Sequence, residues 1–224
     1  MATKTLLGNT VRIVLASRNT GKLKEMQDLF APLGVTFLSQ IDFDFPSVEE
    51  TGTTFVENAL IKARYVCQKS NLPAIADDSG LVVPSLNGNP GIYSARYAAD
   101  RHEHPPTDED NNRKLISELH ALSAFAQPVP AYFYCAMTFL EYADDPTPLV
   151  ASAAWHGTIC PEPRGENGFG YDPHFLVGNG DTASAELPSK EKNRLSHRSQ
   201  ASRSLLAQLQ SRLSPTPSHN LARN

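Results

Sequence analysis

Val11-Arg12-Ile13-Val14-Leu15-Ala16 is a short apolar run, and Ser17-Arg18-Asn19-Thr20-Gly21-Lys22 follows it directly. The run is typical of a buried strand, and the polar residues after it are typical of a loop. Apolar residues then recur at helical spacing up to Gly34 (Leu23, Met26, Phe30, Leu33), which predicts a helix that ends at a glycine. Residues 35–38 indicate a second strand. A strand–loop–helix–strand unit of this kind begins an α/β fold.

The rest of the chain continues this mixture of helices and strands. Thr54 and Glu57 form a capping box, which predicts a long helix with one apolar face (Phe55, Ala59, Ala63, Val66). Residues 131–142 and 149–156 flank a turn and favour an antiparallel pair of strands. Further patterns predict a short strand at 175–177, a helix that begins at Ser189 and a last helix up to Leu213.

Composition excludes several classes of protein. The chain has 224 residues, of which 40% are hydrophobic and 20% charged, and this is typical of a globular protein. The formal net charge is -4 without a long basic run, which argues against a surface dedicated to nucleic acid. No stretch approaches the ~20 apolar residues of a membrane span. Residues 1–10 have only Leu6-Leu7 as an apolar core, so we expect no signal peptide.

The cysteines indicate a reducing compartment. Cys67, Cys135 and Cys160 are odd in number and widely spaced, which is typical of buried thiols and not of a disulfide framework or a zinc site. We therefore expect a cytoplasmic protein. Residues 214–224 are polar with two prolines, and we expect a disordered tail there.

Asp77-Asp78 lies between the apolar runs 73–76 and 81–83. Because an unpaired buried carboxylate is very costly, we expect the pair to face water, a cation or a metal at a strand edge or tip. The alternative is a turn closed by the polar pair and Gly80. Glu49-Glu50 alone is explained by the favourable placement of acids near a helix start. Together the two pairs become a possible Mg²⁺ site with ligands from two segments.

The loop that contains Lys22 resembles a phosphate-binding loop without matching one. Ala16 stands where a P-loop has its first glycine, and Leu23 replaces the hydroxyl residue. Loop N–H groups at a helix start, with Lys22 as a point charge, still predict a site for a phosphate. The alternative is an ordinary loop with a surface lysine.

Two further segments carry groups suited to a nucleotide. Gly168-Phe169-Gly170-Tyr171-Asp172-Pro173 sets aromatic rings between glycines, which favours stacking on a planar base, and Asp172 is a candidate acceptor for base N–H groups. The alternative is a tight hairpin with both rings in the core. Ser196-His197-Arg198, with Lys192 before it, offers cationic or hydrogen-bonding groups for phosphate or base. Its alternative is a solvated helix face.

Four of these segments together resemble the signature set of the dITP/XTP pyrophosphatase family (inosine triphosphatase and RdgB-type enzymes). They are Ser17-Arg18-Asn19-Thr20-Gly21-Lys22, Ala76-Asp77-Asp78-Ser79-Gly80-Leu81, Phe169-Gly170-Tyr171-Asp172-Pro173 and Ser196-His197-Arg198. Supporting stretches are Glu49-Glu50-Thr51-Gly52 with Glu57-Asn58-Ala59, and residues 90–97. No single motif is decisive, but the ordered set is highly specific.

The resemblance implies a Mg²⁺-dependent enzyme that hydrolyses dITP, ITP and XTP to monophosphate and pyrophosphate, and so keeps deaminated purines out of DNA and RNA. It implies an elongated mixed β-sheet flanked by helices, with two lobes and a cleft between them. That single domain would span residues 11–213, after an N-terminal extension (1–10) and before the tail (214–224). It also implies a homodimer.

The resemblance also implies roles for individual residues. Asp78 is the expected general base, and it would hold Mg²⁺ together with Glu49 or Glu50, a choice that the sequence leaves open. The expected substrate-binding residues are Ser17, Arg18, Asn19, Thr20, Gly21, Lys22, Ser79, Phe169, Gly170, Tyr171, Asp172, Lys192, His197 and Arg198. The rival hypotheses are a nucleotide-binding sensor without catalysis and a pyrophosphatase for other modified nucleotides.

Overall fold

The first elements of the fold are those that the sequence predicts. The structure is a computed structural model that describes residues 11–101, 104–178 and 180–213. β1 (Arg12–Leu15), α1 (Thr20–Phe30) and β2 (Thr36–Ser39) form the strand–loop–helix–strand unit. A short 3-10 turn prolongs α1 to Gly34, whose φ of 65° lies in the left-handed region. A glycine adopts this conformation without steric cost, so it ends the helix and turns the chain into β2.

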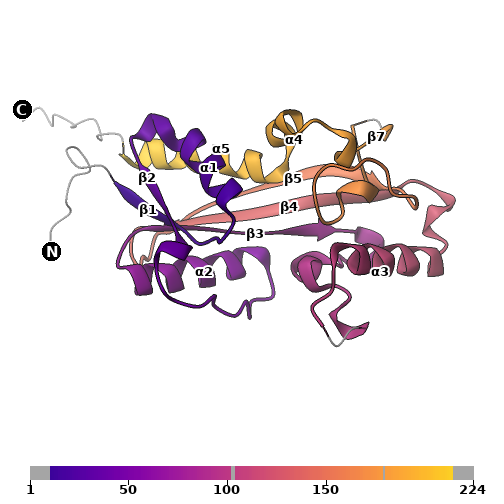
Figure 1. Cartoon of the computed structure of the whole chain (residues 1–224), viewed down its shortest axis with the longest axis horizontal. Helices are drawn as coiled ribbons and strands as arrows, with labels where there is room; N and C mark the ends of the chain where they lie inside the picture. Colours follow the sequence, from indigo (N-terminus) through magenta and orange to yellow (C-terminus); the bar gives the residue numbers. More distant parts are fainter. Residues whose placement is uncertain (1–10, 102–103, 179, 214–224) are drawn as a thin grey trace, which may run out of the picture.

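Within the described residues, the strands form one mixed sheet in the order β2-β1-β3-β4-β5-β6-β7. The other strands are β3 (Ala74–Val82), β4 (Val129–Leu140), β5 (Leu149–Ile159), β6 (Phe175–Val177) and β7 (Thr182–Ala183). β1 pairs in parallel with β2 and β3, and every later pairing is antiparallel. The long strands β3, β4 and β5 run the length of the molecule (Figure 1).

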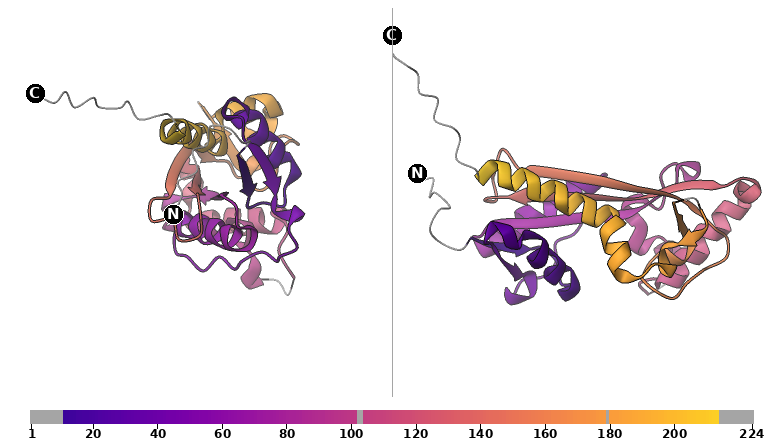
Figure 2. Two further views of the ribbon diagram at one scale, coloured as in Figure 1. Left: turned by 90° about the vertical axis from the view of Figure 1, so that its left-hand side faces the viewer. Right: turned by 90° about the horizontal axis from the view of Figure 1, so that it is seen from above.

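Helices cover both faces of this sheet. α1, α4 (Ser189–Leu195) and α5 (His197–Leu213) lie on one face, and α2 (Phe55–Ser70) and α3 (Asp108–Ala121) lie on the other (Figure 1). Figure 2 shows the sheet end-on between these layers, and from above it shows α5 along the long strands. The predicted capping box of α2 is present, with the Thr54 side chain bonded to Glu57 N and the Glu57 side chain to Thr54 N.

The hydrophobic core is divided between the two ends of the molecule. At one end, one cluster fills the space under α1 and α5 (including Phe30, Phe37, Met137 and Leu205), and a second packs under α2 (including Val14, Ala63, Val66 and Leu140). At the other end, a third cluster joins α3 to β4, β5 and β6 (including Leu115, Leu119, Phe133 and Phe175). The mixed sheet, flanking helices and two lobes confirm the expected fold class.

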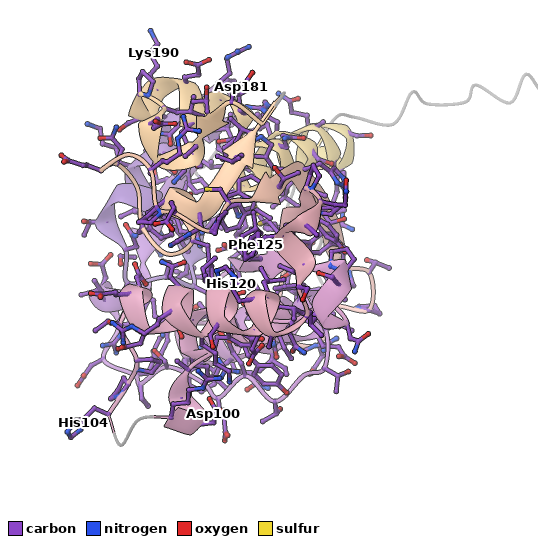
Figure 3. All side chains as sticks on the ribbon, turned by 90° about the vertical axis from the view of Figure 1, so that its right-hand side faces the viewer. Asp100, His104, His120, Phe125, Asp181 and Lys190 are labelled. Atoms are coloured by element: carbon purple, nitrogen blue, oxygen red, sulfur yellow. The ribbon has the colours of Figure 1, made fainter. Side chains whose placement is uncertain are left out.

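The second lobe is the end of the molecule that contains α3 and α4. Figure 3 views this end of the molecule, with α3 across the middle, Lys190 and Asp181 above it and Asp100 below. His120 packs against Phe125, with 4.9 Å between ring centroids, where α3 turns toward β4.

The expected N-terminal extension (1–10) and tail (214–224) lie outside the described residues. In the part of the chain that the structure describes, no helix combines the length and the apolarity of a membrane span.

Candidate active site

Asp77 and Asp78 lie in the middle of β3 and not at its tip, which corrects one part of the prediction. β3 continues to Val82, and both aspartates are buried, with exposures of 6% and 8%. The prediction of a strand edge is confirmed on one side. β1 pairs with β3 only as far as Ile75, and the turn at residues 91–96 reaches β3 again at Leu81, whose N–H donates to Ser94 Oγ (2.9 Å). Between these contacts, no described strand pairs with this edge.

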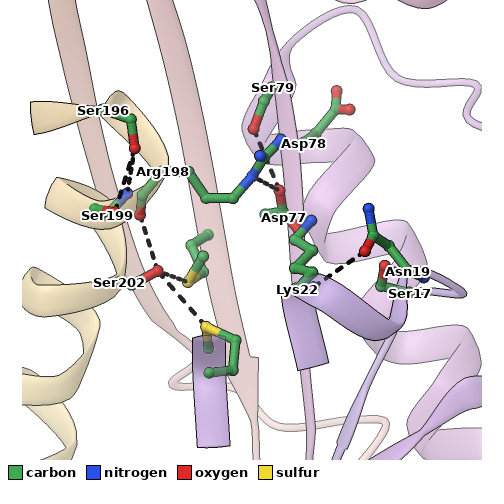
Figure 4. A network of polar contacts seen from close by, with 12 residues as sticks. Ser17, Asn19, Lys22, Asp77, Asp78, Ser79, Ser196, Arg198, Ser199 and Ser202 are labelled. Atoms are coloured by element: carbon green, nitrogen blue, oxygen red, sulfur yellow. Dashed lines mark hydrogen bonds and ion pairs between the residues drawn. The ribbon is translucent and has the colours of Figure 1, made fainter. Parts of the chain in front are cut away.

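The two aspartates point to opposite faces of the sheet, because successive side chains of a strand alternate. Asp77 lies on the face covered by α1 and α5, and Asp78 on the face covered by α2. Figure 4 shows the two carboxylates directed away from each other. The neighbouring acids of the sequence therefore belong to two different groups of side chains.

The group on the α1 and α5 face is an ion-paired cluster. Lys22 Nζ from the first turn of α1 contacts Asp77 Oδ1, and Arg198 Nε from the first turn of α5 lies 3.5 Å from Asp77 Oδ2. Ser79 Oγ donates to the same Oδ2 (3.2 Å). Burial alone would raise the pKa of Asp77, but the charges of Lys22 and Arg198 outweigh it and hold the pKa well below its usual range. Burial of this charge is tolerated because both cations pair with it.

The group on the α2 face brings Glu50 and Asp78 together. Lys62 Nζ lies 2.7 Å from Glu50 Oε1 and 3.2 Å from Asp78 Oδ1. Asn58 Nδ2 donates to Asp78 Oδ2 (3.2 Å). Burial raises the pKa of Asp78, and repulsion from Glu50 adds to the rise against the opposing charge of Lys62. Of the two glutamates between which the sequence leaves the choice open, Glu50 shares the Lys62 ammonium with Asp78, whereas Glu49 is exposed.

The donor atoms of this second group fit a hard divalent cation. The Lys62 ammonium lies at the point where the carboxylates of Glu50 and Asp78 meet, so the position already suits a positive charge. Among the described residues, no group of three or more His, Cys, Asp and Glu side chains could hold a metal ion. Mg²⁺ is usually held by one or two carboxylates with waters and substrate phosphates. The two carboxylates of Glu50 and Asp78 lie within this number.

A pocket next to the Asp77 cluster is lined by rings and cations. Its walls include Phe133, Phe169, Lys192, His197 and Arg198. His197 stacks on Phe133, with ring centroids 5.0 Å apart and 11° between planes. Burial, together with repulsion from Arg198, lowers the pKa of His197 to about 3. The imidazole is therefore neutral near neutral pH, and of the two roles expected from the sequence it can serve as a hydrogen-bonding group.

The loop at residues 168–173 divides its two rings between the pocket and the core. Phe169 is 63% exposed, with Lys192 Nζ 4.9 Å and Arg198 Cζ 5.9 Å from its ring centroid. Tyr171 is buried, and its hydroxyl donates to Ser94 O (2.9 Å). Phe169 is therefore placed where its ring could stack on a planar base, whereas the ring of Tyr171 is packed in the core, as the alternative interpretation expected.

Asp172 organises this loop. It is 2% exposed, and its carboxylate accepts hydrogen bonds from Phe169 N (2.8 Å) and Ser184 Oγ (2.9 Å) and contacts Lys192 Nζ. Gly170 has a φ of 61°, and its N–H donates to Asp108 Oδ2 (2.6 Å) at the start of α3. In this structure the side chain of Asp172 fixes the loop that presents Phe169.

The loop before α1 has two features of an anion site, a helix N-terminus and a lysine, but its arginine points elsewhere. The Asn19 side chain accepts from Lys22 N (3.1 Å) as the N-cap of α1, and Ser17 and Lys22 are half-buried. Arg18, Asn19, Thr20 and Gly21 are exposed. Arg18 reaches toward Phe45 O (3.4 Å) and away from Asp77. The structure therefore brings Lys22 and the helix start to the aspartates, but not the Arg18 guanidinium.

Several residues of the site were not expected from the sequence to have a role of their own. Asn58 belongs to a supporting stretch of the family resemblance and Lys62 to none, and neither was given a role, yet both contact Asp78. Their spacing of four residues, which places them next to each other on one side of the helix, is the signal that was available from the sequence. Phe133 was expected only as a strand residue.

Comparison with known proteins identifies the family. The model of the Ham1 family matches residues 13–208, a range that includes every residue of the candidate site. The chain belongs to the Ham1 family. Ham1 relatives named dITP/XTP pyrophosphatase include one from Legionella pneumophila (strain Lens), 49% identical over 197 residues, which cover 88% of this chain and 97% of the relative. A relative of the same name from Neisseria meningitidis is 51% identical over 199 residues (88% and 96%).

Solved Ham1 structures share the fold. A HAM1 protein from Coxiella burnetii aligns with a TM-score of 0.84 at 45% identity, over 90% of this chain and 100% of that one. The Ham1 protein of Staphylococcus aureus aligns with a TM-score of 0.76 at 39% identity (90% and 99%). The family resemblance inferred from the four motifs is thereby confirmed.

Proposed function

We propose that this chain is a Mg²⁺-dependent pyrophosphatase that hydrolyses dITP, ITP and XTP to the nucleoside monophosphate and pyrophosphate. Membership of the Ham1 family and relatives named dITP/XTP pyrophosphatase support the proposal. The observation that carries it is the convergence of Glu50 and Asp78 beside a lysine, next to a second cluster with two cations and a pocket lined by rings.

The arrangement suits a nucleotide laid across the open edge of β3. Phe169, Phe133 and His197 provide rings for a planar base in the pocket. Lys22 at the start of α1 provides a cation and a helix N-terminus for the phosphates. Ser17, Asn19, Thr20 and Gly21 of the same loop, and Ser79 on β3, are proposed substrate contacts. Of the loop residues, Arg18 is the one that would have to turn from Phe45 to reach a phosphate.

The proposed reaction is attack of water on the α-phosphorus, with pyrophosphate as the leaving group. Asp78 would orient or deprotonate the water, and its raised pKa is the direction that favours a base. Glu50 and Asp78 would hold Mg²⁺, which neutralises the triphosphate and makes pyrophosphate a better leaving group. Lys22 and loop N–H groups would stabilise the charge that develops on the leaving oxygens.

Selection of the base is expected from the donors of the pocket. Lys192 and Arg198 donate hydrogen bonds and accept none, so they match a 6-keto oxygen and not a 6-amino group. Two donors that face each other unpaired cost about 1–3 kcal/mol, or roughly 10- to 100-fold in rate. We therefore expect ITP and XTP to be hydrolysed faster than ATP by about that factor.

A pyrophosphate-release assay with Mg²⁺ and ITP, XTP, GTP or ATP tests the proposal. Hydrolysis in ¹⁸O-labelled water should place the label in the monophosphate, as attack on the α-phosphorus requires. Equal rates on all four nucleotides would contradict a selective enzyme. Binding of ITP without turnover would favour the nucleotide sensor, and preference for a pyrimidine would favour a pyrophosphatase for other modified nucleotides.

We further propose that the chain works as a cytoplasmic homodimer. The family resemblance supports the homodimer, and the number and spacing of the cysteines support the cytoplasm. In light scattering after gel filtration, a dimer has twice the 24.5 kDa mass of one chain. A single species at the mass of one chain would contradict the dimer.

A further inference from the structure

Asn58 is a fully buried polar residue in the first turns of α2. Its exposure is 0%, although it lies on the side of the helix that carries Glu57 and Lys62. Asparagine forms helices less readily than alanine, and an amide buried without hydrogen bonds costs free energy. The residue is therefore unfavourable at this position unless the contacts of its side chain offset both costs.

The side-chain amide of Asn58 connects the two segments that carry the carboxylates. Its Oδ1 accepts from Gly52 N (2.9 Å), two residues after Glu50, and its Nδ2 donates to Asp78 Oδ2 (3.2 Å). The contact with Gly52 is close: a Cβ added at Gly52 would lie 2.8 Å from Asn58 Oδ1. One amide thus joins the loop of Glu50 to the strand of Asp78.

The same hydrogen bond decides which oxygen of Asp78 is presented to a ligand. Asn58 occupies Oδ2, and the other oxygen, Oδ1, faces Lys62 and lies on the side of Glu50. Without the Nδ2 donor, the Asp78 carboxylate can rotate, and Oδ2 loses its partner on the buried side. Groups that hold a metal-binding carboxylate by a hydrogen bond orient it and tune its affinity for the ion.

We propose that Asn58 is a positioning residue that holds Asp78 and the Glu50 loop in register for the metal ion and the attacking water. The inference rests on the proposed function of the site. A residue of this kind makes no contact with substrate, and its loss acts through Asp78. The expected size is about 10- to 100-fold in metal affinity or activity, the usual effect of removing such a partner.

The first test compares Asn58→Ala with Gln27→Ala as a matched control. The Gln27 side chain also joins two backbone groups, Val35 O (3.0 Å) and Phe37 N (2.9 Å), but at the start of β2, away from the aspartates. Mn²⁺ binding is measured by electron paramagnetic resonance with a nonhydrolysable α,β-imido analogue of ITP. We expect Asn58→Ala to lose about 10- to 100-fold in Mn²⁺ affinity and Gln27→Ala to lose none. Equal affinities in the two variants would overturn the inference.

A second variant separates the two hydrogen bonds. Asn58→Asp keeps an acceptor for Gly52 N and removes the donor to Asp78, so we expect kcat for ITP to fall at least tenfold with little change in KM at saturating metal. Wild-type kcat in Asn58→Asp would overturn the inference, because the bond to Gly52 alone would then suffice. A wild-type chain that neither binds Mn²⁺ nor hydrolyses ITP would instead contradict the proposed function.

Discussion

The general base can be tested at a single residue. Asp78→Asn keeps the size of the side chain and removes its charge and basicity. A positioned base contributes ~10²–10⁴-fold, so kcat for ITP should fall by at least that order. Titration calorimetry with the nonhydrolysable analogue should show that the nucleotide still binds. Turnover like that of the wild type would remove Asp78 from the mechanism.

His197 should remain neutral across the physiological range. Its pKa is lowered to about 3 by burial and by Arg198, whereas the unfolded chain has an ordinary histidine with a pKa of 6.5. The unfolded state therefore binds the proton at a higher pH than the folded state does. The contribution of the neutral, buried imidazole to the free energy of unfolding is fully present above about pH 6.5 and is lost as the pH falls toward 3. Nuclear magnetic resonance of ¹⁵N-labelled histidine should show no titration of His197 between pH 5 and 8.

The same residue gives a measurable effect on stability. Between pH 7 and pH 5 the proton taken up by unfolded His197 should lower the free energy of unfolding by about 2 kcal/mol. In His197→Phe this part of the loss should be absent, as judged by urea unfolding at both pH values. An identical fall in wild type and variant would show that the imidazole is not held neutral.

At the scale of elements, the contact between β3 and the turn at residues 91–96 leaves no room for a side chain at Gly80. A Cβ there would lie 2.4 Å from Gly91 O and 2.4 Å from Ser94 Oγ. Overpacking of this kind costs about 1–3 kcal/mol, so Gly80→Ala should lower the urea midpoint. The control is Gly21→Ala in α1, where the nearest atom is Asn19 Oδ1 at 3.2 Å. Alanine in a helix should leave stability unchanged or raise it by about 0.5–1 kcal/mol.

The elements could largely be predicted from the sequence because local chemistry determines them. The capping box at Thr54 and the short strand at Phe175–Val177 are both found where predicted. The placement of Asp77 in mid-strand was missed because it depends on partners remote in sequence: Lys22 and Arg198 neutralise the carboxylate only after folding. Lys62 was missed for the same reason, and Asn58 was expected only as part of a motif, because their contacts with Asp78 depend on the strand that lies beneath α2.

At the scale of the whole molecule, a nucleotide should tie the two lobes together. Lys22 belongs to the first lobe, and Phe169 and Lys192 belong to the second. A ligand at one hundred times its Kd stabilises the folded chain by about 2.7 kcal/mol, or roughly 5–10 °C in Tm for a protein of this size. Calorimetry with Mg²⁺ and α,β-imido-ITP should show this shift. A shift of the same size with the adenine analogue at equal concentration would contradict selection of the base.

The alternation of Asp77 and Asp78 across β3 also has a consequence for protein engineering. Tandem acids that project to a common side can substitute for each other, but here each has its own partners on its own side of the sheet. Loss of one carboxylate is therefore not compensated by the other. Deleting a single residue upstream in β3 would turn Asp78 to the side of Lys22 and Arg198 and Asp77 to the side of α2, so each acid would leave its present partners although every charge is conserved.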